Sequence, residues 1–459
     1  MSDIQKLYEI ERSREVDSIT INDIKIWAFL RNYIGSRLMF RQDRRLRLDA
    51  RRFWHIVKNI FYGVRSLFSA QYDNLIVSSS DQRKEVNGQY VDRMDFLDEL
   101  LPGSFLHIEL PSPDHYPQKD IPGKHVVSKY VIYLLEAIYG AIKYKKPVIQ
   151  NEALLKSVLE ELGVDEDYGA LVKKFYCQYR VMNWLIKRYG IKRMFIANSY
   201  INMGYVLACK KNDCPVVEFQ HGIIGPEHYA YNVFKDLGRN LYPDYLLVFG
   251  NKEKEIFTER NHLISSEKVI TVGNFYIDHM LKATSALRSE FMGVSGKYQK
   301  TVAVSLQDAF EKEICQFIAE AASLDTSICF VMKPRNQDSA YYDRFSLPGN
   351  VVFFDGHDTY ESIKECDFHT TMTSTTAIES PSLGTRNVLM NINNLASEYY
   401  GETLLPPTTL FANSPAELVK IIGESKELSR DYILSSNSEI IGAGYANNLR
   451  GAMAKIFNA

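Results

Sequence analysis

The chain has 459 residues, 46% of them hydrophobic and 24% charged, which is typical of a folded protein with enough apolar material for two cores. Its net charge of −2 provides no overall attraction to nucleic acid, so nucleic acid is not an expected partner. The sequence starts without a signal-peptide pattern, and no run of about 18 apolar residues follows, so we expect a cytoplasmic protein.

Residues 1–70 have mainly helical periodicity and form an expected basic N-terminal segment. Between Arg37 and Arg65 the sequence has eight Arg and one Lys against two Asp, interleaved with apolar residues. This pattern fits peripheral contact with an anionic membrane, here the cytoplasmic face of the inner membrane. It also fits a helix packed on the protein by its apolar stripe, with its arginines in solvent.

From residue 73 onward, short apolar runs alternate with helical stretches. The runs predict strands in two series, at 73–80, 104–110, 194–199, 214–222, 244–250 and 268–274, and then at 301–307, 328–335, 351–356, 368–372 and 386–391. Long helical patterns fill 126–190, and the polar stretch 280–300 is the expected linker. Strands separated by helices indicate parallel sheets with crossover helices. We therefore predict one α/β domain over 71–285, a second over 300–440, and a C-terminal helix over 441–459 that packs back on the first.

Ligands of open parallel sheets bind beyond the carboxyl ends of the strands, so polar residues after apolar runs are of interest. The first such segment is VVEFQHGIIG, residues 216–225. Histidine suits proton transfer near neutral pH, so His221 and Glu218 are candidate catalytic residues. Gly222 would let a substrate approach the backbone. The alternative is a histidine that only satisfies a backbone carbonyl at a strand end.

The second segment is VMKPR, residues 331–335, in which Lys333 and Arg335 flank a proline. Two cations at a strand end suit a diphosphate, or a phosphate with a carboxylate. The alternative is a pair of solvated charges at the border of a loop.

The third segment is HTTMTSTTAIESPSLG, residues 369–384. Ser374, Thr375 and Thr376 are expected to cap a helix whose start could hold an anion, and Glu379 lies about one turn further on, within reach of a ribose diol. Ordinary helix capping is the alternative interpretation.

The stretch TSTTAIESPSLGTRNVLMN, residues 373–391, resembles the donor-nucleotide segment of GT-B glycosyltransferases. The stretches VVEFQHG, YPDYLLVFG and VITVGN resemble bacterial enzymes that build capsular polysaccharide or lipopolysaccharide, and the resemblance covers about residues 190–395. It implies two Rossmann-like α/β domains facing each other across a cleft. In that family the hydroxyls bind donor phosphate and the glutamate often holds the ribose. Lys333-Pro334-Arg335 stands where relatives that use CMP-linked acidic sugars have a His-Pro dipeptide.

The resemblance implies a metal-independent glycosyltransferase without a cofactor, whose partners are a nucleotide-sugar donor and a glycan or lipid-linked glycan acceptor. His221 would be the general base if the enzyme inverts configuration, or would orient the donor if it retains configuration. A nucleotide-sugar 2-epimerase, a polyol-phosphate transferase and a non-catalytic polysaccharide-assembly protein remain alternatives. The sequence has no glycine-rich dinucleotide or P-loop motif and no nucleophile-elbow motif, which argues against those enzyme classes.

Overall fold

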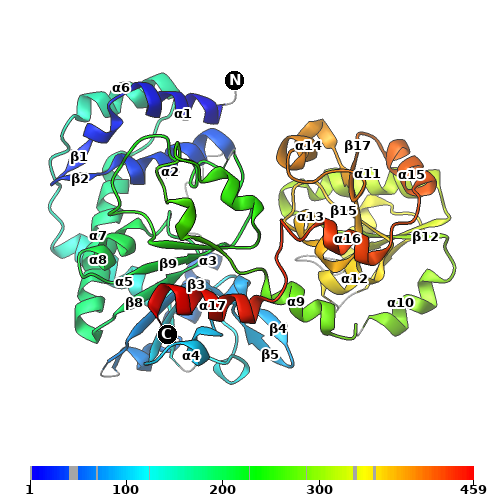
Figure 1. Ribbon diagram of the computed structural model, residues 1–459, viewed down its shortest axis with the longest axis horizontal. Coiled ribbons are helices and arrows are strands. Elements are labelled where there is room, and N and C mark those ends of the chain that lie inside the picture. The colour runs from blue at the N-terminus through cyan, green and yellow to red at the C-terminus, as the bar shows by residue number, and fades with distance from the viewer. Residues whose placement is uncertain are drawn as a thin grey trace. The chain divides into compact units, whose positions relative to one another are not determined.

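The computed structural model in Figure 1 describes residues 3–40, 50–68, 71–123, 125–226, 228–285, 287–333, 339–354 and 358–458. Internal contacts divide the chain into two compact units. The N-terminal unit comprises Met1–Phe249, Glu253–Val272 and Ala446–Ala459, and the C-terminal unit comprises Gly250–Lys252 and Gly273–Tyr445. Arg335 and the middle of the Arg37–Arg65 stretch, residues 41–49, lie outside the described residues.

The N-terminal unit contains a parallel seven-stranded sheet (Figure 1). In spatial order its strands are β11 (Val269–Thr271), β10 (Tyr245–Val248), β9 (Val216–Phe219), β8 (Arg193–Ile196), β3 (Asn74–Ser79), β6 (Phe105–Leu110) and β7 (Val126–Ser128). Two short antiparallel hairpins are formed by β1 (Thr20–Ile21) with β2 (Ile24–Lys25), and by β4 (Lys84–Val86) with β5 (Gln89–Val91). Parallel strands are covered on both faces, which is why they appear in the sequence as continuous apolar runs.

Helices of this unit precede, connect and follow the strands. They are α1 (Asp3–Ser13), α2 (Trp27–Phe40), α3 (Ala50–Ile60), α4 (Leu97–Leu100), α5 (Lys129–Ile142), α6 (Glu152–Leu162), α7 (Tyr168–Tyr189), α8 (Met203–Lys210) and α17 (Tyr445–Phe457). The last of these, red in Figure 1, lies against the sheet, where the ring of Phe457 is 6.0 Å from that of Phe195 on β8.

The C-terminal unit contains a parallel six-stranded sheet in the order β14 (Val351–Phe353), β13 (Ile328–Met332), β12 (Lys300–Val304), β15 (Phe368–Thr370), β16 (Arg386–Met390) and β17 (Thr409–Ala412). Its helices are α9 (Phe275–Lys282), α10 (Arg288–Ser295), α11 (Glu311–Leu324), α12 (Thr359–Glu365), α13 (Thr376–Glu379), α14 (Leu395–Tyr400), α15 (Pro415–Glu424) and α16 (Arg430–Ser436). The stretch 280–300, expected as a linker, forms the end of α9 and all of α10.

Each sheet has one point at which the direction of strand addition reverses. In the N-terminal unit the chain runs from β3 to β6 and β7, and then places β8 on the other side of β3. In the C-terminal unit it runs from β12 to β13 and β14, and then places β15 on the other side of β12. Such switch points open a crevice at the carboxyl edge of a parallel sheet. The fold therefore defines two places in which to look for a ligand.

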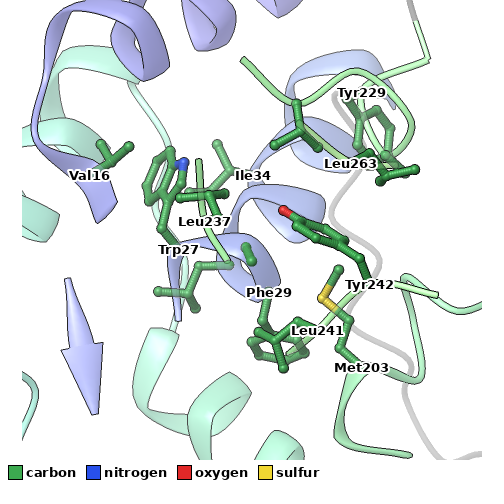
Figure 2. Close-up of a cluster of buried hydrophobic side chains, with 14 of the residues drawn as sticks. Val16, Trp27, Phe29, Ile34, Met203, Tyr229, Leu237, Leu241, Tyr242 and Leu263 are labelled. Atoms are coloured by element: carbon green, nitrogen blue, oxygen red, sulfur yellow. The ribbon is translucent and has the colours of Figure 1, made fainter. Parts of the chain in front are cut away.

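The N-terminal helices pack on the long connection that follows β9. Figure 2 shows Trp27, Phe29 and Ile34 of α2 gathered with Leu237, Leu241 and Tyr242 of this connection. Trp27 and Phe29 are completely buried. Helix α2 is thus part of the core of the unit, and it supports a connection that begins at Gln220.

An ion pair lies inside this core. Arg31 and Glu11 are both fully buried and hydrogen-bonded to each other, and the Arg31 guanidinium also donates to the carbonyls of Tyr229, at 2.6 Å, and Asn232, at 2.7 Å. Glu11 accepts further hydrogen bonds from the Trp27 indole and the Phe234 amide. Burial alone would lower the pKa of Arg31, but the charge and hydrogen bond of Glu11 raise it above its ordinary value. Arg31 therefore stays charged inside the core.

Removing one partner of this pair would leave an uncompensated buried charge. We expect Glu11→Ala to lower the free energy of unfolding by about 3–5 kcal/mol. The control is Arg14→Ala, which breaks the half-exposed Arg14–Glu161 pair and should cost at most about 1 kcal/mol. Denaturant unfolding followed by circular dichroism measures both. Equal effects of the two variants would contradict the structural role given to Glu11.

Candidate functional site

The carboxyl edge of the N-terminal sheet carries His221 on the turn after β9. The Asn198 amide nitrogen, from the end of the neighbouring strand β8, lies 3.3 Å from His221 Nε2, and the Tyr200 ring lies 6.0 Å from the imidazole. His221 Nδ1 is buried and has no hydrogen-bond partner among the described residues. Burial, the charge of Arg93 and the nearby His228 lower the pKa of His221 to about 3. The imidazole is therefore neutral at physiological pH.

The turn that holds His221 is fixed on both sides. The Gln220 side chain donates to the Gly222 carbonyl and to Glu253, both at 2.9 Å, and accepts from the amide of Phe249. Arg93, a residue without a sequence signal, donates to the Gln220 carbonyl. A side chain at Gly222 would meet no atom within 4 Å, so the turn borders open space. A group presented to this space would meet a backbone that is held in place.

Glu218 lies inside β9 and is fully buried. Its carboxylate accepts hydrogen bonds from Ser199 Oγ at 2.6 Å, from the Ser199 amide at 3.3 Å and from the Tyr231 hydroxyl at 2.8 Å. Burial outweighs these hydrogen bonds and raises the pKa of Glu218 to about 7. Glu218 thus joins the end of β8 to the connection after β9, while its proposed catalytic role stays a prediction.

A second polar network, which the sequence did not predict, occupies the β3 and β6 ends of the same edge. Arg83 donates to Glu109, at 2.5 Å, and to Asp95, at 2.8 Å, and His115 Nδ1 lies 2.8 Å from Glu109. Burial alone would raise the pKa of Glu109, but hydrogen bonding to His115 and the charge of Arg83 lower it to about 2. His107, on the same strand, contacts Ser78 Oγ at 2.6 Å. The polar residues His107 and Glu109 inside the apolar run FLHIEL were the available signal.

In the C-terminal unit, the switch point between β12 and β15 is bracketed by Gln307 and Thr373. The Gln307 amide donates to Thr373 Oγ1 at 3.1 Å, and its carbonyl accepts from the Thr373 amide at 2.9 Å. Gln307 was not among the predicted site residues. Ser374 and Thr375 follow directly, with Ser374 partly buried and Thr375 exposed.

Helix α13 begins after these hydroxyls. Thr375 occupies its N-cap without a side-chain capping hydrogen bond, and Ser374 Oγ accepts a long one, 3.4 Å, from the Thr376 amide. Thr376 Oγ1 is buried and has no hydrogen-bond partner among the described residues. The hydroxyl of Ser374 therefore makes the expected capping contact and that of Thr375 does not.

The other predicted donor-binding residues lie close to this edge in the fold. Glu379 ends α13, is buried, and accepts a hydrogen bond of 2.8 Å from the Tyr360 hydroxyl. Lys333 follows β13, the neighbour of β12, and is partly exposed. The structure thus brings Ser374, Thr375, Thr376 and Glu379 to one segment and Lys333 to the end of a nearby strand. Within the described ranges, no group of three His, Cys, Asp or Glu side chains is placed to hold a metal ion.

No protein-family model and no curated protein matches the sequence. Among solved structures, the UDP-GlcNAc 2-epimerase of Methanocaldococcus jannaschii aligns over 83% of this chain and 99% of its own, with a TM-score of 0.50 and 11% identity. The fold is GT-B. The UDP-GlcNAc 2-epimerase of Neisseria meningitidis bound to UDP-GlcNAc aligns over 83% and 100%, with a TM-score of 0.48 and 13% identity. The calicheamicin glycosyltransferase CalG4 aligns over 85% and 100%, with a TM-score of 0.49 and 15% identity.

The predicted fold class is thereby confirmed, because the chain has two Rossmann-like α/β units of the GT-B type. At this level of identity the likeness concerns the fold alone.

The raised pKa of Glu218 makes stability depend on pH. Between its ordinary value of 4.5 and about 7, the folded chain keeps a proton that the unfolded chain releases. The free energy of unfolding should therefore fall as pH rises through this window. Glu218→Gln stays neutral, so its Tm relative to the wild type should rise between pH 5 and pH 8. Calorimetry checks this, with the exposed Glu424→Gln as control. A Tm difference that is constant with pH would contradict it.

Proposed function

We propose that the chain is a glycosyltransferase that moves a sugar from a nucleotide-activated donor to a glycan or lipid-linked glycan acceptor in bacterial surface polysaccharide synthesis. The observation that carries the proposal is His221, a neutral imidazole on a fixed turn beside open space, whose buried Nδ1 has no hydrogen-bond partner among the described residues. The GT-B fold supports a nucleotide sugar as the substrate class, because a protein of that fold, the M. jannaschii enzyme, is named for one.

The donor is proposed to bind at the β12–β15 switch point of the C-terminal unit. The hydroxyls of Ser374, Thr375 and Thr376 would donate hydrogen bonds to the phosphate oxygens, and Lys333 and Arg335 would supply positive charge. The buried Thr376 hydroxyl, which lacks a partner among the described residues, supports an interaction with a bound group. Glu379 would hold the ribose, directly or through Tyr360.

In an inverting reaction His221 would take the proton of the acceptor hydroxyl as its oxygen bonds to the anomeric carbon. The bond from that carbon to the donor phosphate breaks, and the nucleotide leaves with the electron pair. The transition state gains negative charge on the phosphate, which cationic groups stabilise. Lys333 and Arg335 are our candidates for this role. In a retaining reaction His221 would orient the donor sugar.

A nucleotide-sugar 2-epimerase is the second candidate, and one grouping of residues favours it. His221, His228 and Tyr231 surround Tyr200, with ring centroids 5.8–6.0 Å from it. Two imidazoles near one aromatic ring could provide the pair of proton-transfer groups that inversion at a ring carbon needs. Proton NMR of nucleotide sugars incubated without an acceptor separates the candidates, because only an epimerase would convert the donor into its C2 epimer.

The donor assignment predicts the behaviour of two variants. Lys333→Ala should weaken binding of the preferred nucleotide by about tenfold or more, as expected for loss of a charged hydrogen bond. Glu379→Gln, which can keep the contact with Tyr360, should weaken it if the carboxylate holds the ribose. Isothermal titration calorimetry measures both, with Lys420→Ala on the exposed surface of α15 as the matched control. The donor assignment is wrong if neither variant changes the affinity.

The catalytic assignment predicts that His221→Ala lowers turnover by about 100- to 10,000-fold while Tm and nucleotide affinity change little. The exposed His262→Ala is the matched control. Because the neutral form persists above a pKa of about 3, turnover should not fall as pH drops from 7 to 5 through protonation of this group. A His221→Ala protein that melts early but keeps its rate per folded molecule would make the residue structural.

A further inference from the structure

Helix α3 exposes an aromatic stripe that no part of the described chain covers. Phe53, Trp54, Val57 and Phe61 are all exposed, Trp54 by 67% and Phe61 by 70%. At 100° per residue Phe53, Trp54 and Val57 of α3 fall within one arc of about 100° around the helix axis, and Phe61 lies in the turn directly after the helix. A solvent-facing helix surface normally carries polar side chains on this arc. The exposed side of α3 is therefore more apolar than that of an ordinary surface helix.

The opposite side of α3 is the side that packs on the protein. The Asn59 amide donates to Asp114 at 2.8 Å, and the Tyr130 hydroxyl of α5 lies 3.2 Å from His55 Nδ1. Lys58, at the border between the two sides, pairs with Asp114 at 2.7 Å. The orientation of α3 is thus fixed by polar contacts, and its aromatic residues are held outward.

Helix α5, against which α3 packs, carries a second exposed apolar stripe. Leu134, Ile138 and Ile142 follow one another at intervals of four residues, and Ile142 is 74% exposed. These positions lie on the same side of α5 as Tyr130, the residue that contacts α3. Three exposed lysines, at positions 143, 145 and 146, follow the end of the stripe.

We infer that these two stripes, called here the α3–α5 surface, dock the protein on an anionic lipid bilayer. Aromatic and branched apolar side chains enter the interfacial region, and adjacent cations meet the lipid phosphates. The charge pattern selects this occupant: the Arg-rich sequence from Arg37 to Arg65 precedes and contains α3, and lysines follow α5. A second copy of the chain would bring like charges together. The docking is peripheral, since no described helix has the length and apolarity to cross a bilayer.

The inference stands apart from the proposed enzyme activity, because vesicle binding is measured without substrate. The full chain should sediment with vesicles that contain phosphatidylglycerol and much less with pure phosphatidylcholine, and high salt should weaken the binding. Phe61→Ser and Ile142→Ser should each lower the partition coefficient by about tenfold, the effect of losing one buried apolar side chain. Leu324→Ser, which removes an exposed apolar residue of the C-terminal unit, is the matched control and should bind as the wild type does.

Tryptophan fluorescence tests the depth of α3 directly. Trp27 is buried and Trp184 is half exposed, so in Trp184→Phe the fluorescence that responds to vesicles comes from Trp54. Binding to vesicles should shift the Trp54 emission to the blue, because the indole enters a less polar environment. Vesicles with brominated acyl chains should in addition quench this emission. Absence of binding, or binding that Phe61→Ser and Ile142→Ser leave unchanged, would overturn the inference. The inference would also be overturned if light scattering showed a dimer that these two variants dissociate. In that case the surface would join two copies of the chain.

Discussion

The buried pair of Glu11 and Arg31 is the interaction on which the candidate site of the N-terminal unit depends. It joins α1 and α2 to two backbone carbonyls and one backbone amide of the connection after β9. The same connection presents Tyr231, whose hydroxyl binds Glu218, and Glu218 in turn binds Ser199 at the end of β8. The N-terminal helices therefore set the position of the residues around His221, although they lie far from it in sequence. A buried pair has this effect because its charges are satisfied in one arrangement only.

Two buried glutamates of one sheet show how their partners decide the protonation state. Glu109 faces Arg83 and His115, which lower its pKa to about 2, so its negative charge is permanent at physiological pH. Glu218 faces hydroxyls and one amide, and burial raises its pKa to about 7. The edge of the sheet thus combines a fixed charge with a group that titrates near neutrality.

The sequence was sufficient to predict most of the parallel strands, because strands covered on both faces appear as apolar runs between helices. It failed for β7, because this strand leads directly into α5 and its residues were included in the helical pattern of 126–190, and it did not single out β17. It also failed for the stretch 280–300, where Phe291 and Leu287 are buried in a segment that looks polar overall.

Within the candidate site, strand-end position was enough to single out His221 and the Ser374–Glu379 segment. The partners that fix them were not predictable, because they are distant in sequence: Gln307 and Thr373 are 66 residues apart, and Arg93 is 127 residues from Gln220. Pairings of this kind can be predicted only once the order of the strands in the sheet is known. Sequence spacing alone also could not show that Glu218 is directed into the protein.

The return of α17 to the N-terminal unit has a consequence for biosynthesis. Residues 273–445 of the C-terminal unit leave the ribosome before the stretch that starts at Ala446, which belongs to the N-terminal unit. At about 5–20 residues per second, the N-terminal unit waits roughly ten seconds or more for the helix that covers Phe195. During that interval the later-made unit can fold first, while the nascent N-terminal sheet keeps an apolar patch that a chaperone can recognise.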